Sequence, residues 1–298
     1  MTSGTSAMYA DYLRRLRVAD PGTPSTEGLF ALHRAHVERV PFENLGIQLG
    51  RPPGIDPELS VRRLAAGTGG YCFHLNGAFS ALLETLGYDV TRHYGGVAKD
   101  PASQEISGDH LTLTVRVEGA EYLVDVGLGD GPHEPLPLRE GTYEQGGFPY
   151  ALERLERLER LEPRVAEGEG GSGAGGWSLH NSARPAPRMN FRSAPAVMAD
   201  FAPMHAWLSA DEDSPFVRTL VLYRRDAGGI DALQGRVLSR IDPLGGTSKR
   251  ELSDSGEFYE AVATVFGRDL GDLTPADRTA LWSRVLRAHE AWAAARPA

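Results

Sequence analysis

Apolar positions recur at helical spacing through the first third of the chain. Residues 8–16, and a second stretch that follows Ser25, place apolar side chains three and four positions apart, which predicts two amphipathic helices. Residues 60–66 predict a short third helix with Ser60 near its N-cap. The same spacing runs from residue 72 to residue 86, and Gly87 then ends this helix, as a glycine at that position commonly does.

The hydrophobic period shortens to two in the middle of the chain. Residues 88–97 predict a strand, and residues 110–117 alternate apolar and polar side chains with many β-formers. Gly119 and Ala120 turn the chain, and residues 121–126 return as a second strand. We therefore predict an antiparallel hairpin, followed by glycine- and proline-rich sequence over residues 127–147.

The pattern is mixed after residue 150. Three Glu-Arg-Leu repeats at residues 153–161 have a strict period of three, which gives a helix a poor apolar face, so a solvated strand edge and a frayed helix both stay open. Residues 216–224 and 236–241 predict strands. Residues 258–266 and 275–295 predict helices, the second with Pro275 at its first position.

Composition narrows the class of protein. The 298 residues are 41% hydrophobic and 24% charged, which is ordinary for a globular protein of up to three domains. The single cysteine excludes intrachain disulfides and cysteine-rich metal sites. With no signal-peptide pattern and no apolar run near the ~20 residues that span a bilayer, a cytoplasmic location is expected. The net charge of −9 argues against nucleic acid and anionic membranes as partners.

The single cysteine is the first candidate for chemistry. Cys72 stands where the glycine-rich turn Gly69-Gly70-Tyr71 runs into the predicted helix. A thiol at a helix N-terminus meets the positive end of the helix dipole, which favours the thiolate. Cys72 is therefore a candidate nucleophile, and an inert buried cysteine is the alternative interpretation.

A thiolate nucleophile needs a base, and the base needs an orienting group. His110 opens the first strand of the predicted hairpin, and Asp125 lies near the end of the second. In an antiparallel hairpin these two positions are neighbours. We predict an imidazole–carboxylate pair, with a purely structural hydrogen bond as the alternative.

Four ordered motifs resemble those of the arylamine N-acetyltransferase family. They are Arg39 with Val-Pro-Phe-Glu-Asn-Leu at residues 40–45, Gly69-Gly70-Tyr71-Cys72-Phe73 with Asn76, Asp109-His110-Leu111, and Val124-Asp125-Val126-Gly127. The resemblance covers nearly the whole chain, and four motifs in matching order are far more specific than any one of them.

The resemblance implies an α+β fold of three domains with a papain-like Cys-His-Asp triad. A helical bundle at residues 1–87 would carry Cys72, a β-barrel at residues 88–200 would carry His110 and Asp125, and an α/β lid would occupy residues 201–298. The run from Trp282 to Trp292 is expected to pack a helix face on the barrel rather than to form a binding surface.

The resemblance also implies the reaction. Cys72 would take an acyl group, acetyl by family default, from a thioester such as acetyl-CoA and pass it to an arylamine or related amine by ping-pong kinetics. No permanently bound cofactor and no metal are expected. Donor binding is assigned to Gly127, Leu128, Gly129 and Ser209. The substrate pocket and the support of the motifs are assigned to Phe42, Glu43, Tyr71, Phe73, His74 and Trp207, with an anchoring role in the lid core as the alternative for Trp207.

The chain departs from the family beside the nucleophile. Thr68 stands where the family has an arginine that pairs with the glutamate equivalent to Glu43. Either another cation takes that place, with Arg39, Arg62 and Arg63 as candidates, or Glu43 is more exposed.

Further departures lie near the expected substrate sites. His74 replaces a glutamate and is either a second titrating group or a surface or interdomain histidine. Leu128 stands where a phenylalanine is frequent, Asp130 opposes phosphate binding at the glycine loop, and three acidic residues occupy positions 211–213 of the lid.

Because of these departures, the sequence does not identify the acyl donor or the amine acceptor. One possibility is an amide synthase of natural-product biosynthesis, which releases a polyketide chain from an acyl carrier protein as an amide or macrolactam. The acidic lid argues against that partner, since carrier proteins are usually acidic. A papain-like hydrolase and an inactive binding module also stay open, and the sequence does not predict the oligomeric state.

Overall fold

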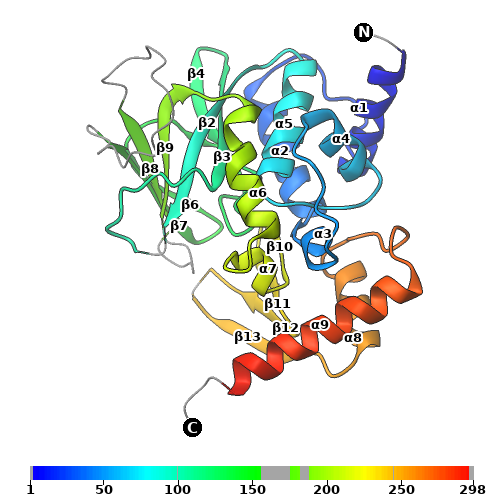
Figure 1. Cartoon of the computed structure of the whole chain (residues 1–298). Helices are drawn as coiled ribbons and strands as arrows, with labels where there is room; N and C mark the ends of the chain where they lie inside the picture. The colour runs from blue at the N-terminus through cyan, green and yellow to red at the C-terminus, as the bar shows by residue number, and fades with distance from the viewer. Residues whose placement is uncertain (1–2, 99, 156–174, 182–187, 244, 295–298) are drawn as a thin grey trace.

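The computed structural model describes residues 3–98, 100–155, 175–181, 188–243 and 245–294. In these ranges a helical domain and a β-barrel lie side by side, and a third unit of sheet and helices lies against both (Figure 1). No helix in these ranges has the length and apolar character that crossing a membrane would require.

The helical domain is built around one buried helix. Its helices are α1 (Ser3–Leu16), α2 (Thr26–Arg39), α3 (Leu45–Gln48), α4 (Pro57–Ala65) and α5 (Cys72–Thr85). Leu75, Phe79 and Leu82 of α5 are fully buried, because this helix is covered by its neighbours and by the barrel. Leu86 caps its C-terminus, and Gly87 follows with a φ of 93°, a conformation that favours glycine.

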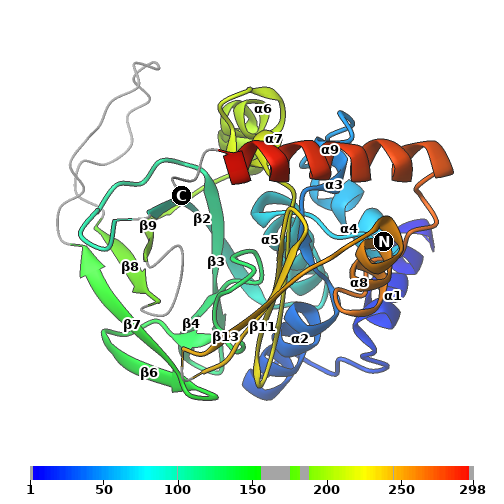
Figure 2. The same cartoon turned by 90° about the horizontal axis from the view of Figure 1, so that it is seen from below.

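Eight antiparallel strands form a nearly closed barrel, which Figure 2 shows beside the helical domain. The strands are β2 (Asp89–Ala98), β3 (His110–Val117), β4 (Ala120–Val124), β5 (Leu136–Pro137), β6 (Gly141–Gln145), β7 (Phe148–Leu155), β8 (Gly176–His180) and β9 (Arg188–Pro195). Their spatial order is β5-β4-β3-β2-β9-β8-β7-β6. The predicted hairpin is β3–β4, in which Leu113 faces Val124 and Val117 faces Ala120.

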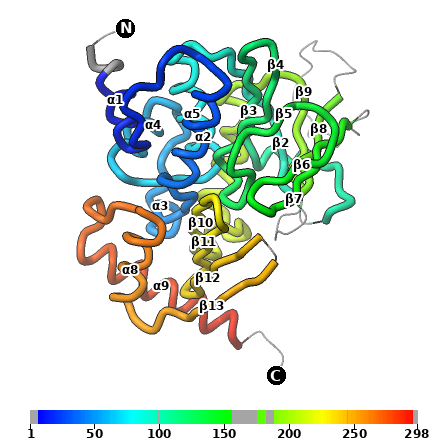
Figure 3. The backbone as a smooth tube through the Cα atoms, turned by 180° about the vertical axis from the view of Figure 1, so that it is seen from behind, coloured from blue at the N-terminus to red at the C-terminus, as the bar shows by residue number. Residues whose placement is uncertain are grey.

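The third unit is a five-stranded antiparallel sheet with helices on one face. After the short η1 (Met198–Phe201), its elements are α6 (Ala202–Ala210), α7 (Pro215–Arg218), β10 (Val221–Asp226), β11 (Gly229–Gln234), β12 (Val237–Ile241), β13 (Thr247–Glu251), α8 (Ser255–Thr264) and α9 (Pro275–Ala294). Leu222, Phe258 and Leu281 share the core between sheet and helices. Seen from behind, this sheet lies below the junction of the other two units (Figure 3).

One strand of this sheet comes from the helical domain. β1 (Phe42–Glu43) is its edge strand, and Phe42 faces Tyr223 while Glu43 faces Leu222 of β10. Glu43 also donates its N–H to the carbonyl of Gly70 at 2.8 Å. The Phe-Glu-Asn motif therefore joins the third unit directly to the glycine turn before α5.

The predicted α+β class, with bundle, barrel and α/β unit, is confirmed, and two local predictions are wrong. Residues 216–224 do not form one strand: Ser214 caps the short helix α7, with Pro215 at its first position, before β10 begins. Likewise Asp56, not Ser60, caps α4, by accepting the N–H of Leu59 at 2.8 Å. Of the Glu-Arg-Leu repeats, residues 153–155 belong to β7, and the rest lies outside the described residues.

Candidate functional site

Cys72 is the first residue of α5. Tyr71 is the N-cap in extended conformation, and its N–H is accepted by His74 Nδ1 at 3.4 Å, which satisfies one donor at the helix start. The Cys72 thiol donates to the carbonyl of Asp109 at 3.4 Å, and the residue is only 3% exposed. The helix start therefore aims the thiol at the first residues of the barrel strand β3.

His110 and Asp125 meet beside that thiol. His110 opens β3 and Asp125 follows the end of β4, so that His110 Nε2 lies 2.6 Å from Asp125 Oδ2. His110 also forms a side-chain hydrogen bond with Cys72. Because Nε2 is taken by Asp125, Nδ1 is the ring nitrogen left for the thiol.

The environment favours a charged His110–Asp125 pair. Burial works against a charge on His110, but the charge and hydrogen bond of Asp125 and the hydrogen bond to Cys72 hold the pKa of His110 well above its usual value. Burial also tends to raise the pKa of Asp125, yet the charge of His110 and the hydrogen bonds from His110 and Asn76 bring it below its usual value. The pair is thus arranged to hold an imidazolium against a carboxylate.

Asn76 connects the helix to this carboxylate. It lies four residues after Cys72, on the same face of α5. Its Nδ2 donates to Asp125 Oδ1 at 2.9 Å and to the carbonyl of Leu111 at 2.6 Å, while its Oδ1 accepts the N–H of Val126 at 2.9 Å. Asn76 therefore holds the helix bearing the thiol and the hairpin bearing the imidazole in one arrangement.

A glycine loop follows Asp125 and passes close to Cys72. Gly127 donates its N–H to Asp125 Oδ1 at 2.8 Å, and a Cβ at this position would lie 2.8 Å from Cys72 Cα. Gly129 has a φ of 75°, and a Cβ there would lie 2.9 Å from Tyr223 Cβ and 3.2 Å from Phe42 Cβ. Only glycine fits at these two positions, so the backbone of the loop lies directly against the site.

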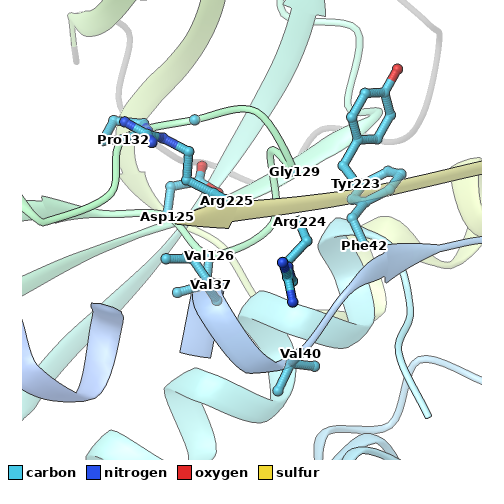
Figure 4. A pocket seen from close by; sticks show the side chains of 11 residues that line it. Val37, Val40, Phe42, Asp125, Val126, Gly129, Pro132, Tyr223, Arg224 and Arg225 are labelled. Atoms are coloured by element: carbon cyan, nitrogen blue, oxygen red, sulfur yellow. The ribbon is translucent and has the colours of Figure 1, made fainter. Parts of the chain in front are cut away.

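Two cavities adjoin this region. The first, lined by Asp125, Gly129 and Tyr223 among others (Figure 4), holds about 10 Å³, which is room for roughly one water. The second holds about 800 Å³, in the size range of a ligand site, and lies over the sheet of the third unit and the end of α9.

The large cavity follows one row of cross-strand neighbours. Phe42 faces Tyr223, Tyr223 faces Ala232, Ala232 faces Ser239, and Ser239 faces Lys249, so these side chains share one face of the sheet. All but Phe42 line the cavity. Four interstrand spacings carry the row roughly 19 Å from Phe42, beside the glycine loop, to Lys249 at the far edge.

The far end of this cavity is basic and aromatic. Besides Lys249, it is lined by Arg250, His289 and Trp292, with Glu251 as the acidic member. The expectation that the run from Trp282 to Trp292 packs on the barrel is wrong. Trp282 packs on Phe258 of α8, with ring centroids 5.3 Å apart, because α9 covers the third unit's own sheet.

Glu43 is buried and paired with a cation that the sequence did not suggest. Its Oε1 lies 3.4 Å from Arg268 Nε, and both side chains are at most 3% exposed. The candidates Arg39 and Arg62 instead pair with Glu38 and Glu58. Arg268 lies in the loop between α8 and α9, and no local pattern near Glu43 or Thr68 could have indicated it.

His74 is buried, so it is not a surface histidine, and its ring centroid lies 6.0 Å from that of His205 in the third unit. Burial lowers its pKa to about 3, so it is neutral at pH 7, with Nε2 donating to the carbonyl of Pro53 at 3.3 Å. Tyr71 lies beside it and forms a hydrogen bond through its hydroxyl with His205 Nδ1 of α6. Phe73 packs on Phe201 at 5.0 Å.

The surroundings of the remaining predicted residues differ from one another. Trp207 on α6 is 41% exposed, so it does not anchor a core. Ser209 is buried and donates to the carbonyl of Ala206 within its own helix at 3.3 Å. Leu128 packs with the barrel core. In the described ranges, no group of three acidic, histidine or cysteine side chains is placed to bind a metal ion.

Known proteins share both the sequence pattern and the fold. The family model described as N-acetyltransferase matches residues 25–274. The arylamine N-acetyltransferase of Mycolicibacterium smegmatis is 30% identical over 92% of this chain and 97% of that protein. The proansamycin X synthase of Amycolatopsis mediterranei is 32% identical over 47% of this chain and 56% of that protein.

Two solved structures extend the likeness to the whole fold. The arylamine N-acetyltransferase of Nocardia farcinica superposes with a TM-score of 0.80 at 30% identity, covering 94% of this chain and 95% of that one. The Mycobacterium marinum enzyme in complex with CoA gives a TM-score of 0.78 at 26% identity, covering 94% and 99%.

Proposed function

The chain belongs to the arylamine N-acetyltransferase family, and from this premise we propose that it transfers an acetyl group from acetyl-CoA to an arylamine through a thioester on Cys72. The observation that carries the proposal is the hydrogen-bonded series Cys72–His110–Asp125 at the start of α5. Nucleophile, base and orienting group are in contact, as acyl transfer through a cysteine requires.

In the first half of the reaction Cys72 is acylated. His110 accepts the thiol proton, and the Cys72 sulfur attacks the thioester carbonyl while the positive end of α5 favours its negative charge. Backbone N–H groups at the start of α5, including that of Cys72, stabilise the oxyanion. The carbon–sulfur bond to CoA then breaks, and the CoA thiolate takes the proton from His110.

In the second half an amine takes the acyl group. The amine nitrogen attacks the acyl-Cys72 carbonyl, and His110 accepts the proton that the nitrogen loses. The bond to the Cys72 sulfur breaks, and the sulfur recovers its proton or remains paired with the imidazolium. Asp125 stabilises the positive charge on His110 in both halves.

The large cavity supports CoA as the donor. It leads from Tyr223, beside the glycine loop, to a basic and aromatic end at Lys249 and Trp292. A thioester at the inner end would place a phosphate-bearing nucleotide near Lys249 and an adenine ring near the face of Trp292, because cations bind phosphate and indole rings stack on bases. An acyl carrier protein would not need this end of the cavity.

Intact-mass analysis of the wild-type protein tests the proposal. We expect incubation with acetyl-CoA alone to add one acetyl group, which peptide mapping places on Cys72, and added arylamine to remove it as the acetylated amine. An adduct formed only from acyl-carrier thioesters would instead favour an amide synthase. Hydrolysis that amines do not affect would favour a hydrolase, and no adduct from any donor would favour a binding module.

Removing the charge of Lys249 is expected to weaken acetyl-CoA binding selectively. We expect Lys249→Gln to raise the KM for acetyl-CoA by about tenfold, since a charge-assisted phosphate contact contributes ~1.5 kcal/mol or more, with kcat little changed. The same variant should keep the wild-type KM for acetyl-pantetheine, which lacks the nucleotide. Steady-state kinetics with both donors measure the difference.

The control for this prediction is Arg287→Gln. Arg287 is an exposed cation on the same helix as Trp292, outside the residues that line the cavity. We expect it to leave both KM values unchanged. Equal KM values for acetyl-CoA in wild type and Lys249→Gln would mean that the nucleotide binds elsewhere.

The family also supports two broader proposals for this chain. We place its functional units at residues 1–87, 88–200 and 201–298, with the nucleophile on the first and the base on the second. We also assign it to the cytoplasm, where a catalytic thiol stays reduced.

A further inference from the structure

A loop of the third unit is docked on the turn that precedes the nucleophile. The loop runs from Gly267 to Asp272, between α8 and α9. Asp269 donates its N–H to the carbonyl of Gly67 at 2.9 Å, and Arg15 of α1 donates to the carbonyl of Gly267 at 2.5 Å. Gly67 has a φ of 91°, and a Cβ there would lie 2.6 Å from Asp269 Cβ, so the approach requires glycine.

Arg268 enters the protein from this loop and is held in one orientation. Its side chain is 2% exposed, and its two terminal nitrogens donate to the two carboxylate oxygens of Asp272 at 2.7 Å each. This bidentate contact fixes the plane of the guanidinium and leaves the Nε edge toward Glu43, 3.4 Å away. Asp272 therefore fixes the Arg268 guanidinium in the orientation that faces Glu43.

Glu43 in turn holds the glycine turn. Its Oε1 accepts the N–H of Gly69 at 3.3 Å, and its Oε2 accepts the N–H of Leu45 at 2.5 Å. A Cβ on Gly69 would lie 2.2 Å from the carbonyl of Pro41, so the turn has no room to shift toward β1. Gly69, Gly70 and Tyr71 lead directly into Cys72, and the position of this carboxylate therefore sets where α5 begins.

A buried carboxylate requires a cation or several donors to remain charged and in place. Thr68, the residue next to Gly69, does not supply one, since its hydroxyl donates to the carbonyl of Arg63 at 2.7 Å. We propose that Arg268, reaching across from the third unit, is the positioning residue that holds Glu43 and thereby the catalytic cysteine. The inference rests on the proposed function only in taking Cys72 as the nucleophile.

Through these contacts the third unit helps to hold the turn that precedes Cys72. The order of contacts is Asp272, Arg268, Glu43, Gly69 and then Cys72, and every link except the last is an ion pair or a hydrogen bond. Arg268 touches no reacting atom. Its removal should act on the placement of the thiol and not on the chemistry of His110 and Asp125.

The test compares Arg268→Gln and Arg268→Lys with the wild type. We expect Arg268→Gln to lower kcat/KM for acetyl transfer by about 10- to 100-fold, as a small misplacement of a reacting group does. The rate of Cys72 alkylation by iodoacetamide should fall in parallel across neutral pH. Because Cys72 is the only cysteine, alkylation reports this site alone. Arg268→Lys keeps the charge and should retain part of both rates.

The control separates positioning from stability. Arg278 donates to the carbonyl of Leu270 in the same loop at 2.9 Å, and its guanidinium lies over the ring of Tyr259. Arg278→Gln should lower the thermal unfolding midpoint while leaving the alkylation rate unchanged. If Arg268→Gln likewise loses only stability, with wild-type alkylation and kcat/KM, the inference is wrong.

A rescue variant and a fallback variant keep the proposal testable. Thr68→Arg in the Arg268→Gln background places a guanidinium beside Gly69 and should restore alkylation and kcat/KM in large part. If Arg268→Gln does not fold, Arg268→Lys becomes the test, because it keeps the buried charge but loses the bidentate contact to Asp272. Wild-type alkylation and kcat/KM in Arg268→Lys would then overturn the inference. If acetyl-CoA fails to acylate wild-type Cys72, the proposed function is contradicted. The alkylation comparison does not use acetyl-CoA, so it tests the positioning role of Arg268 separately.

Discussion

Replacing Cys72 by alanine is expected to abolish acetyl transfer. Without the sulfur no thioester can form, so the reaction loses its covalent intermediate, and we expect kcat/KM to fall by at least ~10⁴-fold, toward what binding and positioning alone provide. Intact-mass analysis after incubation with acetyl-CoA should find no acetylated protein. The fold should persist, since alanine fills most of the space at this helix start.

The control for this variant lies on the same helix. Ser80→Ala removes another small polar side chain of α5, one that donates to the carbonyl of Gly77 at 2.8 Å and lies two turns beyond Cys72. We expect it to lower stability slightly and to retain acetyl transfer. Transfer that persists in Cys72→Ala at more than a trace would rule out the covalent mechanism.

Neutralising Asp125 is expected to have the second-largest effect. Asp125→Asn keeps the shape of the side chain but removes the charge that faces His110 Nε2 at 2.6 Å. Loss of the equivalent carboxylate in a catalytic triad costs about 10⁴-fold in kcat, and we expect a loss of roughly 10³- to 10⁴-fold here. Steady-state kinetics under saturating acetyl-CoA and amine measure it.

The same substitution has a signature in titration. Since Asp125 raises the pKa of His110, the asparagine variant should titrate His110 at lower pH than the wild type. Histidine NMR signals followed over pH show the direction of the shift. Unchanged titration together with full activity would mean that Asp125 has only a structural role.

Asp231 offers a matched control for the loss of a buried carboxylate. It is buried in the third unit and pairs with Arg224 at 3.0 Å and with Arg240 at 3.1 Å. Asp231→Asn should lower the free energy of unfolding, because Arg224 loses its carboxylate partner and Arg240 keeps only Asp226, but acetyl transfer should continue. An equal loss of activity in both variants would point to a general effect on folding.

The candidate triad was predictable because its parts are set by local patterns. The helix that begins at Cys72 follows from its 3.6-residue period and its glycine turn, and the hairpin that holds His110 and Asp125 follows from alternation over two adjacent strands. Both signals depend on residues near one another in sequence. The structure then brings the two elements together through Asn76, which lies at helical spacing from Cys72.

Local predictions failed where capping competed with hydrophobic pattern. The apolar residues after Phe216 suggested a strand, but Ser214 and Pro215 start a helical turn there, since a capping hydroxyl and a fixed φ stabilise that start. Ser60 lies inside α4 for the same reason, because Asp56 and Pro57 form a stronger helix start. In both cases the deciding residues stand just before the hydrophobic pattern begins.

By itself, the sequence determined the α+β class, the start of α5 at Cys72 and the hairpin that brings the side chains of His110 and Asp125 together. It also indicated the family through four ordered motifs. These features depend on hydrophobic periodicity, on turn residues and on residues that are close together in the sequence, so they can be recognised from local patterns.

Only the tertiary structure decided which cation serves Glu43, how Phe42 joins the third sheet, and where the large cavity runs. Arg268 and Glu43 lie far apart in the sequence, and the row from Tyr223 to Lys249 exists only once four strands have paired in register. Contacts between segments that are far apart in the sequence follow from packing and strand register, so a local sequence pattern does not predict them.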